Sequence, residues 1–206
     1  MIEKILNIIF PKTCLKCGKQ EGQYICSSCL HSLNCKIYFM KAKNKLYNYL
    51  IYLFKYKNQA RKDMINFKFN DKAFMAEYFI EFLCYNNKLA KFLKTFDFII
   101  PVPTTLNKKK ARGYNQTELL AENLSKRLNI PVNKNILIKM KNNKTKKERS
   151  INVKNVFSIR NQMIIKNKKI ILIDDIFTTG FTINECSKIL KENSVKEICV
   201  LIICKG

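Results

Sequence analysis

The stretch "IILIDDIFTTGFT", residues 170 to 182, decides the fold. Its leading Ile and Leu residues indicate a buried strand over 170 to 175, which ends in Asp174 and Asp175. A Thr/Gly turn follows, and the apolar spacing beyond it indicates a helix from about 182 to 192. This strand, turn and helix predict one unit of an α/β fold.

The rest of the chain repeats the alternation of strands and helices. We expect further strands at 50–56, 96–103 and 198–204, helices at 73–83 and 115–128, and a polar loop at 139–150. Asn115 or Thr117 is expected to cap the second of these helices. The order predicts an α/β domain with a largely parallel sheet.

The turn after the two acids has the chemistry of a phosphate site. Backbone amides and hydroxyls converge at a helix start, where the helix dipole favours an anion, and a glycine lets the backbone approach closely. Asp174 and Asp175 can accept hydrogen bonds from vicinal hydroxyls, so the pair and the turn together suit a sugar phosphate. The expected binding residues of the turn are Thr178, Thr179, Gly180, Phe181 and Thr182.

Two other readings of the acids are weaker. A nucleotide-binding strand of the Walker B kind needs a glycine-rich phosphate loop, and the five glycines of the chain cannot form one. Acids that merely face solvent at a strand end would not need "TTGFT" directly after them.

Four cysteines near the N-terminus give a second specific signal. They form two CxxC pairs separated by eight residues, a spacing that lets four thiolates surround one zinc ion. A site closed by four thiolates is structural, and buried free thiols are the less favoured alternative. The expected ligands are Cys14, Cys17, Cys26 and Cys29.

Charge and length limit the class of protein. The net charge of +24 favours polyanions such as nucleic acid, although the Lys-, Asn- and Ile-rich composition also allows lysines that are merely solvated. Basic clusters at 108–112 and 141–149 lie in expected loops, where phosphates could reach them. With no apolar run near the ~20 residues of a membrane span and no export signal, we expect no membrane insertion and a cytoplasmic protein. Residues 1–45 are expected to hold a short helix and a zinc ribbon, and residues 46–206 the main domain.

The motifs together resemble a known family. "IILIDDIFTTGFT" is similar to the phosphoribosyl pyrophosphate signature of type I phosphoribosyltransferases, with Phe177 in place of an aliphatic residue. "ARGYNQ" (111–116), "RSINVKNVF" (149–157) and "INFKFNDKAFMAEYF" (65–79) resemble segments of the ComF family of competence proteins, as do the paired CxxC motifs. The resemblance implies a type I phosphoribosyltransferase-like parallel sheet with helices on both faces, preceded by a small zinc ribbon.

The resemblance also implies ligands and roles. Phosphoribosyl pyrophosphate would bind with magnesium, with Asp174 and Asp175 on the ribose hydroxyls and Arg112 near the pyrophosphate. Further candidates for contacts to pyrophosphate or nucleic acid are Lys108, Lys109, Lys110 and Arg149. The loop before Arg149 is shorter than in the family and lacks its Gln. Since the resemblance implies that this loop closes over the reacting sugar, the difference concerns turnover more than ligand binding.

Two classes of function remain open. One is a phosphoribosyltransferase that serves DNA uptake in natural transformation. The other is a non-catalytic protein that binds nucleotide or single-stranded DNA and docks a competence helicase.

Overall fold

The computed structural model describes residues 11–32, 37–43, 45–69, 72–140 and 156–206. The expected helix at the N-terminus and most of the polar loop at 139–150 lie outside these residues. The described elements, in chain order, are α2 (Ser27–Ser32), β1 (Tyr38–Lys41), β2 (Tyr49–Lys55), α3 (Asn58–Phe69), α4 (Met75–Cys84), α5 (Asn87–Leu93), β3 (Phe98–Pro101), α6 (Leu106–Arg112), α7 (Gln116–Leu128), β4 (Leu137–Lys139), β5 (Phe157–Ile159), α8 (Gln162–Ile165), β6 (Lys169–Phe177), α9 (Phe181–Glu192) and β7 (Glu197–Lys205).

A five-stranded sheet in the order β1-β2-β7-β6-β3 forms the centre of the molecule. The four strands from β2 to β3 are parallel, and β1 adds an antiparallel edge. The prediction of an α/β fold with a largely parallel sheet is therefore confirmed. A division of the chain after residue 45 would separate β1 from β2, its partner in the sheet.

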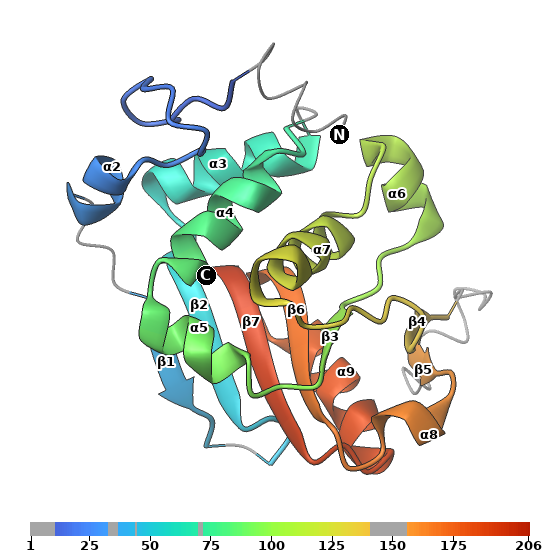
Figure 1. Ribbon diagram of the computed structural model, residues 1–206. Coiled ribbons are helices and arrows are strands. Elements are labelled where there is room, and N and C mark those ends of the chain that lie inside the picture. Colours follow the sequence, from blue (N-terminus) through green and yellow to red (C-terminus); the bar gives the residue numbers. More distant parts are fainter. Residues whose placement is uncertain (1–10, 33–36, 44, 70–71, 141–155) are drawn as a thin grey trace.

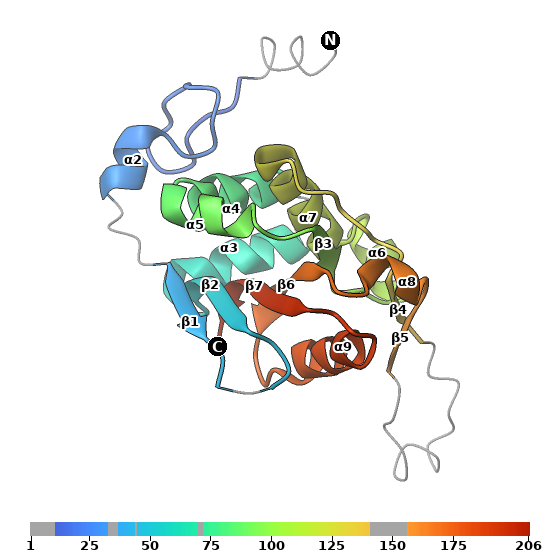
Figure 2. The ribbon, with the colours of Figure 1, turned by 60° about the horizontal axis from the view of Figure 1, so that its bottom comes forward.

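Helices cover both faces of this sheet, as Figures 1 and 2 show: α3, α4, α5 and α7 lie on one side and α9 on the other. The reason is the composition of the central strands, in which nearly every side chain is apolar. In β7, alternate residues enter two separate cores, with Leu201 in the first and Val200 in the second. Strands that are buried on both faces need helices on both faces.

Strand β6 extends further than the sequence predicts. It continues through Ile176 and Phe177, because β7 runs beside it and pairs these residues with Cys204 and Lys205. Asp174 and Asp175 therefore lie inside the strand rather than at its end.

The basic stretch before residue 113 was expected to be a loop and is the helix α6. Its Leu, Lys, Ala and Arg residues have good helix propensity, and a glycine first interrupts them at Gly113, whose φ is +73°. Helix α7 begins as expected, with the Asn115 side chain accepting a hydrogen bond from the backbone N–H of Thr117.

Candidate functional site

Asp174 and Asp175 point to opposite faces of β6, because successive side chains of a strand alternate. On the face covered by α3, Asp175 Oδ2 lies 2.8 Å from Lys68 Nζ. On the face covered by α9, the positive charge of Lys139 acts to lower the pKa of Asp174, and the negative charge of Asp174 acts to raise the pKa of the Cys186 thiol. The two carboxylates therefore meet different partners.

Burial raises the pKa of Asp174 to about 8, and the neighbouring charge of Asp175 adds to this effect. Three features oppose the rise: the backbone N–H of Asp175, which donates to Asp174 Oδ1 at 2.8 Å, and the charges of Lys68 and Lys139. Asp174 consequently binds a proton more readily in the folded protein than in the unfolded chain.

The turn after β6 leads directly into helix α9. Gly180 is the N-cap of α9 with φ +77°, a left-handed conformation that L side chains rarely adopt. A Cβ atom at this position would also lie 2.6 Å from Cζ of Phe177. Thr178 and Thr179 are exposed, and the first backbone amides of α9 are directed to the same end of the sheet. The prediction of a turn that opens a helix is confirmed.

The segment 112–116, from the end of α6 to the start of α7, contacts the end of α3 that carries Lys68. Arg112 lies over the ring of Phe69, at 5.1 Å from the ring centroid, and Phe69 follows Lys68. Arg112 also donates from Nη1 to Gln116 Oε1 at 3.0 Å, while the Tyr114 hydroxyl donates to the carbonyl oxygen of Phe67 at 2.6 Å. The end of α3 thus connects the "RGYNQ" stretch to Asp175.

The other predicted basic residues are not gathered around the acids. Lys109 is paired with Glu118, at 3.1 Å, and both line a pocket of about 120 Å³ beyond the end of β3. Lys110 is exposed on α6. The side chain of Lys108 and all of Arg149 lie outside the described residues. By contrast, the sequence motifs do not single out Lys68, although it lies in a stretch that resembles the family.

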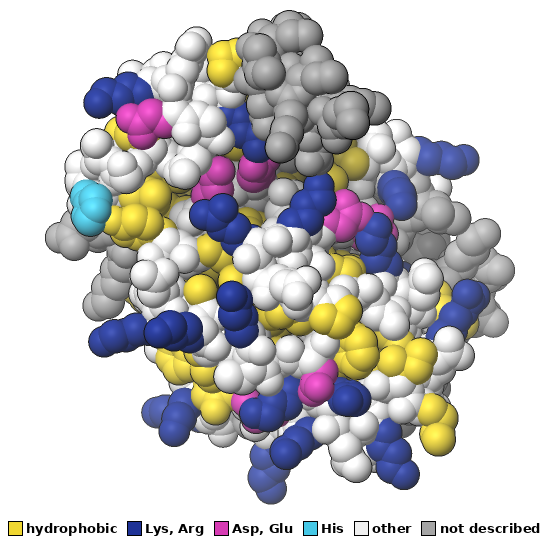
Figure 3. Space-filling model, viewed as in Figure 1, with side chains coloured by type: hydrophobic (Ala, Val, Ile, Leu, Met, Phe, Trp, Pro, Cys, Tyr) yellow, Lys and Arg dark blue, Asp and Glu magenta, His cyan; other side chains and the backbone are white. Residues whose placement is uncertain are grey.

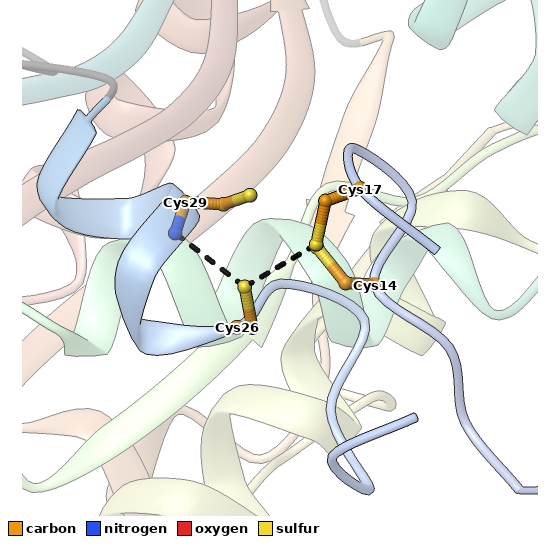
Figure 4. A group of neighbouring side chains, drawn as sticks. All are labelled: Cys14, Cys17, Cys26 and Cys29. Carbon is orange, nitrogen blue, oxygen red and sulfur yellow. Dashed lines mark hydrogen bonds between the residues drawn. The ribbon is translucent and has the colours of Figure 1, made fainter. Parts of the chain in front are cut away.

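The four cysteines do converge. Figure 4 shows the four side chains turned toward one another. Their sulfur atoms all lie within 4.8 Å of one another, and those of Cys17 and Cys26 are 3.6 Å apart. Tetrahedral zinc with Zn–S bonds of about 2.3 Å requires sulfurs about 3.8 Å apart, so the four thiols fit this metal. Burial disfavours the thiolate of Cys14, but backbone hydrogen bonds from Cys26, Cys17 and Lys16 outweigh it and lower its pKa to about 6. The group can hold a metal such as zinc.

This cysteine segment is packed against α4. The buried carboxylate of Glu81 accepts a hydrogen bond from the backbone N–H of Tyr24 at 2.9 Å. Lys12 pairs with Glu77, and the His31 ring meets the Tyr85 hydroxyl at 2.6 Å. These contacts join the cysteine segment to the same core as the sheet.

Magnesium has no comparable site of its own. Among the residues that the structure describes, the four cysteines are the one group of three or more potential metal ligands. Asp174 and Asp175 point apart, and Asp175 already faces an ammonium group. The described residues therefore form no magnesium site by themselves, and a magnesium ion here would need oxygen ligands from a bound polyphosphate.

Comparison with known proteins defines the class. Residues 116–206, which include β6, the turn, α9 and β7, match the Phosphoribosyl transferase domain. The protein thus has a type I phosphoribosyltransferase fold. The chain is 30% identical over 199 residues to Competence protein ComFC of Streptococcus pneumoniae, a match that covers 92% of this chain and 79% of the relative. It belongs to the ComF family.

Two further relatives are similar over a shorter range. Competence protein F of Haemophilus influenzae is 41% identical over 117 residues, which cover 52% of this chain and 50% of the relative. The DNA utilization protein YhgH of Escherichia coli K12 is 27% identical over 114 residues, which cover 53% of this chain and 49% of the relative. The chain thus spans about half the length of these two relatives.

No helix among the described residues is long and apolar enough to cross a membrane.

Proposed function

We propose that this protein binds phosphoribosyl pyrophosphate with magnesium at the carboxyl edge of β6 and acts in the cytoplasm in DNA uptake for natural transformation. One observation carries the ligand assignment: the turn with Gly180 at its left-handed N-cap directly follows a strand that contains Asp174 and Asp175. A phosphate-binding turn and two hydroxyl acceptors on one strand match the two ends of a phosphorylated ribose.

In this proposal the turn holds the 5-phosphate. The backbone amides at the start of α9 and the hydroxyls of Thr178, Thr179 and Thr182 donate to its oxygens, with Gly180 and Phe181 contributing amides. Although their side chains point to opposite faces of β6, Asp174 and Asp175 are proposed to hold the ribose hydroxyls, directly or through water on magnesium, and a bound magnesium ion would neutralise the pyrophosphate.

Arg112 and Lys68 supply positive charge on the side of the sheet covered by α3. Lys68 is already 2.8 Å from Asp175, and Arg112 lies one side chain further, over Phe69. We propose that both groups face the ligand's pyrophosphate when it binds. As that group departs, such preorganised charges stabilise it without reorganisation.

The role in DNA uptake comes from the relatives, two of which are named as competence proteins and a third as a DNA utilization protein. The family resemblance implies a phosphoribosyltransferase activity. Turnover is tested separately, as release of pyrophosphate in the presence of candidate amines and nucleobases.

An alternative is a non-catalytic protein that binds nucleotide or single-stranded DNA and docks a competence helicase. The observation in its favour is the net charge of +24. Lys109, Lys110 and Arg112 contribute to this charge from the last turn of α6. In the view of Figure 3, however, Lys and Arg side chains are spread over the whole face with few acids between them, so this view shows no single basic track.

Calorimetric titration tests the ligand assignment. Phosphoribosyl pyrophosphate with magnesium is titrated into the wild type, into Asp175→Asn and, as a matched control, into Asp97→Asn, which alters an acid directly before β3. We expect heat from the wild type and the control and about tenfold weaker binding to Asp175→Asn. A wild type that gives neither heat nor thermal stabilisation would refute the assignment.

Salt dependence tests the alternative. Affinity for single-stranded DNA is measured at several salt concentrations, for the wild type and for a variant in which Lys108, Lys109 and Lys110 are replaced by Gln. If these lysines contact phosphates, the slope of log affinity against log salt falls by about 2. An unchanged slope would remove α6 as the DNA-binding surface.

A further inference from the structure

A basic groove with aromatic walls lies at the carboxyl ends of β2 and β7. Its volume is about 410 Å³, and it is lined by Tyr52, Lys55, Tyr56, Lys57, Lys205 and Gly206. All the ionisable side chains of this lining are lysines and tyrosines. The carboxyl edge of a parallel sheet is where α/β proteins commonly bind ligands.

The lysines of the groove are held close together by the fold. Lys55 and Lys205 are directly opposite each other in the register of β2 and β7. Like charges in such a position destabilise a sheet. None of the Asp and Glu side chains that the structure describes forms an ion pair with Lys55, Lys57 or Lys205. A bound anion would relieve this repulsion.

The aromatic side chains give the groove a rigid floor. Tyr52 is buried, with 7% of its surface exposed, and its ring stacks on that of Tyr38 with 4.3 Å between centroids and 6° between planes. The Nζ atom of Lys205 lies 5.4 Å from the Tyr52 centroid. Tyr56 is half-buried at the mouth. Because Tyr38 and the Lys205 ammonium group already lie against the Tyr52 ring, a flat ligand that carries negative charge would contact the part of Tyr52 that remains exposed and the side chain of Tyr56.

Phe177 connects this groove to the turn after β6. Its ring is beside Gly180 on one side, and on the other it lies 5.7 Å from Lys205 Nζ. The carbonyl oxygen of Phe177 also accepts a hydrogen bond from the backbone N–H of Gly206 at 2.9 Å. Phe177 therefore lies between Lys205, which lines the groove, and the proposed phosphate turn.

We propose that this groove binds a planar nitrogen heterocycle with a carboxylate substituent, and that this molecule is the acceptor of the phosphoribosyl group. The acceptor role rests on the proposed function. Lys55, Lys57 and Lys205 receive the carboxylate, and Tyr52 and Tyr56 contact the ring.

Transfer of the phosphoribosyl group replaces one bond at the anomeric carbon with another. A ring nitrogen gives its lone pair to the anomeric carbon, the bond from that carbon to the pyrophosphate oxygen breaks, and pyrophosphate leaves with the bonding electrons. A proton on that nitrogen, where there is one, passes to the departing pyrophosphate.

The test compares acids with their uncharged counterparts. Nicotinate and orotate are titrated into the full chain beside nicotinamide and uracil, and binding is followed by saturation-transfer NMR and calorimetry. We expect the carboxylates to bind about tenfold more tightly than the neutral rings, because a charge-assisted contact is lost in the latter.

Variants then locate the site. Lys55→Gln and Lys205→Gln are each expected to weaken carboxylate binding about fivefold. Lys188→Gln, which alters an exposed lysine of α9, is expected to have no effect. Because Lys55 and Lys205 repel each other, the two single variants should melt no lower than the wild type, so that weaker binding cannot be attributed to unfolding.

Three results would overturn the proposal: no binding of either acid, equal binding of acids and neutral rings, or an equal effect of Lys188→Gln. A protein that binds phosphoribosyl pyrophosphate but neither acid overturns the groove and leaves the proposed function intact. The protein could instead bind the acids through these lysines and fail to bind phosphoribosyl pyrophosphate. That result supports the groove as an anion site and overturns both the proposed function and the acceptor role.

Discussion

Lys68 Nζ lies 2.8 Å from Asp175 Oδ2, and the two side chains are only 17% and 13% exposed. This ion pair connects the last turn of α3 to the middle of the sheet at the proposed ribose site. Because both charges have lost most of their water, each depends on the other for compensation. Asp175 is thus kept beside a positive charge before any ligand arrives.

We predict that Lys68→Met lowers the free energy of unfolding by about 2 kcal/mol, because it leaves the carboxylate of Asp175 buried without a partner. The double variant Lys68→Met/Asp175→Asn should lose less than the sum of the two single changes, with a coupling of about 1 kcal/mol or more. Urea denaturation of the four proteins measures the cycle.

Lys109→Met is the matched control for this cycle. Its ion pair with Glu118 has a similar distance, 3.1 Å, but its side chain is 48% exposed. An exposed pair contributes at most about 1 kcal/mol, so this variant should be close to the wild type. Equal losses at positions 68 and 109 would show that burial does not distinguish the two pairs.

We predict that the raised pKa of Asp174 makes the free energy of unfolding depend on pH. Burial raises its pKa from 3.8 to about 8, so between these values the folded protein holds a proton that the unfolded chain has released. The resulting stabilisation is complete below the unfolded pKa and is lost as pH rises through the folded one. Asp174→Asn should therefore become more stable relative to the wild type as pH rises from 5 to about 8, by at most about 1.4 kcal/mol per pH unit.

Denaturation at pH 5, 6, 7 and 8 measures this difference, and Glu192→Gln, which alters an exposed acid at the end of α9, serves as the control. A constant difference between Asp174→Asn and the wild type across the range would show that Asp174 ionises normally in the folded protein.

Local signals explain which parts of the structure could be predicted from the sequence. The strand β6, its turn and α9 are contiguous, and their apolar spacing and Thr/Gly turn are visible in the single stretch from residue 169 to residue 192. The cysteine group is equally local, since both CxxC pairs lie between Cys14 and Cys29.

Long-range contacts explain what was missed. Lys68 and Asp175 meet only because α3 packs across the sheet, and no pattern near either residue indicates the other. The same holds for Lys55 and Lys205, which the pairing of β2 with β7 brings together. Strand β1 also escaped prediction, because three of its four residues are exposed and it has no alternating pattern.

Replacing Gly180 is expected to strain the backbone at the N-cap of α9. Gly180→Ala would place a Cβ atom 2.6 Å from Phe177 Cζ in a backbone with φ +77°, so we expect a loss of about 2 kcal/mol in unfolding free energy and weaker ligand binding. Gly22→Ala separates the two causes, because Gly22 has φ +69° but nothing within 4 Å of the added atom. Its loss should be about 1 kcal/mol. Equal losses in a thermal melt would mean that the Phe177 ring simply moves aside.

Metal removal tests the four-cysteine site. The purified protein is expected to contain one zinc ion, because its four sulfur atoms lie within 4.8 Å of one another. Treatment with a chelator should lower the melting temperature by at least about 5 °C, since Cys14, Cys26 and Cys29 belong to the same buried core as α4. Cys17→Ser should lose most of the zinc, whereas Cys84→Ser, which alters a free cysteine on α4, should keep it. Metal analysis by mass spectrometry measures the content of each variant, and a folded wild type that contains no zinc would refute the site.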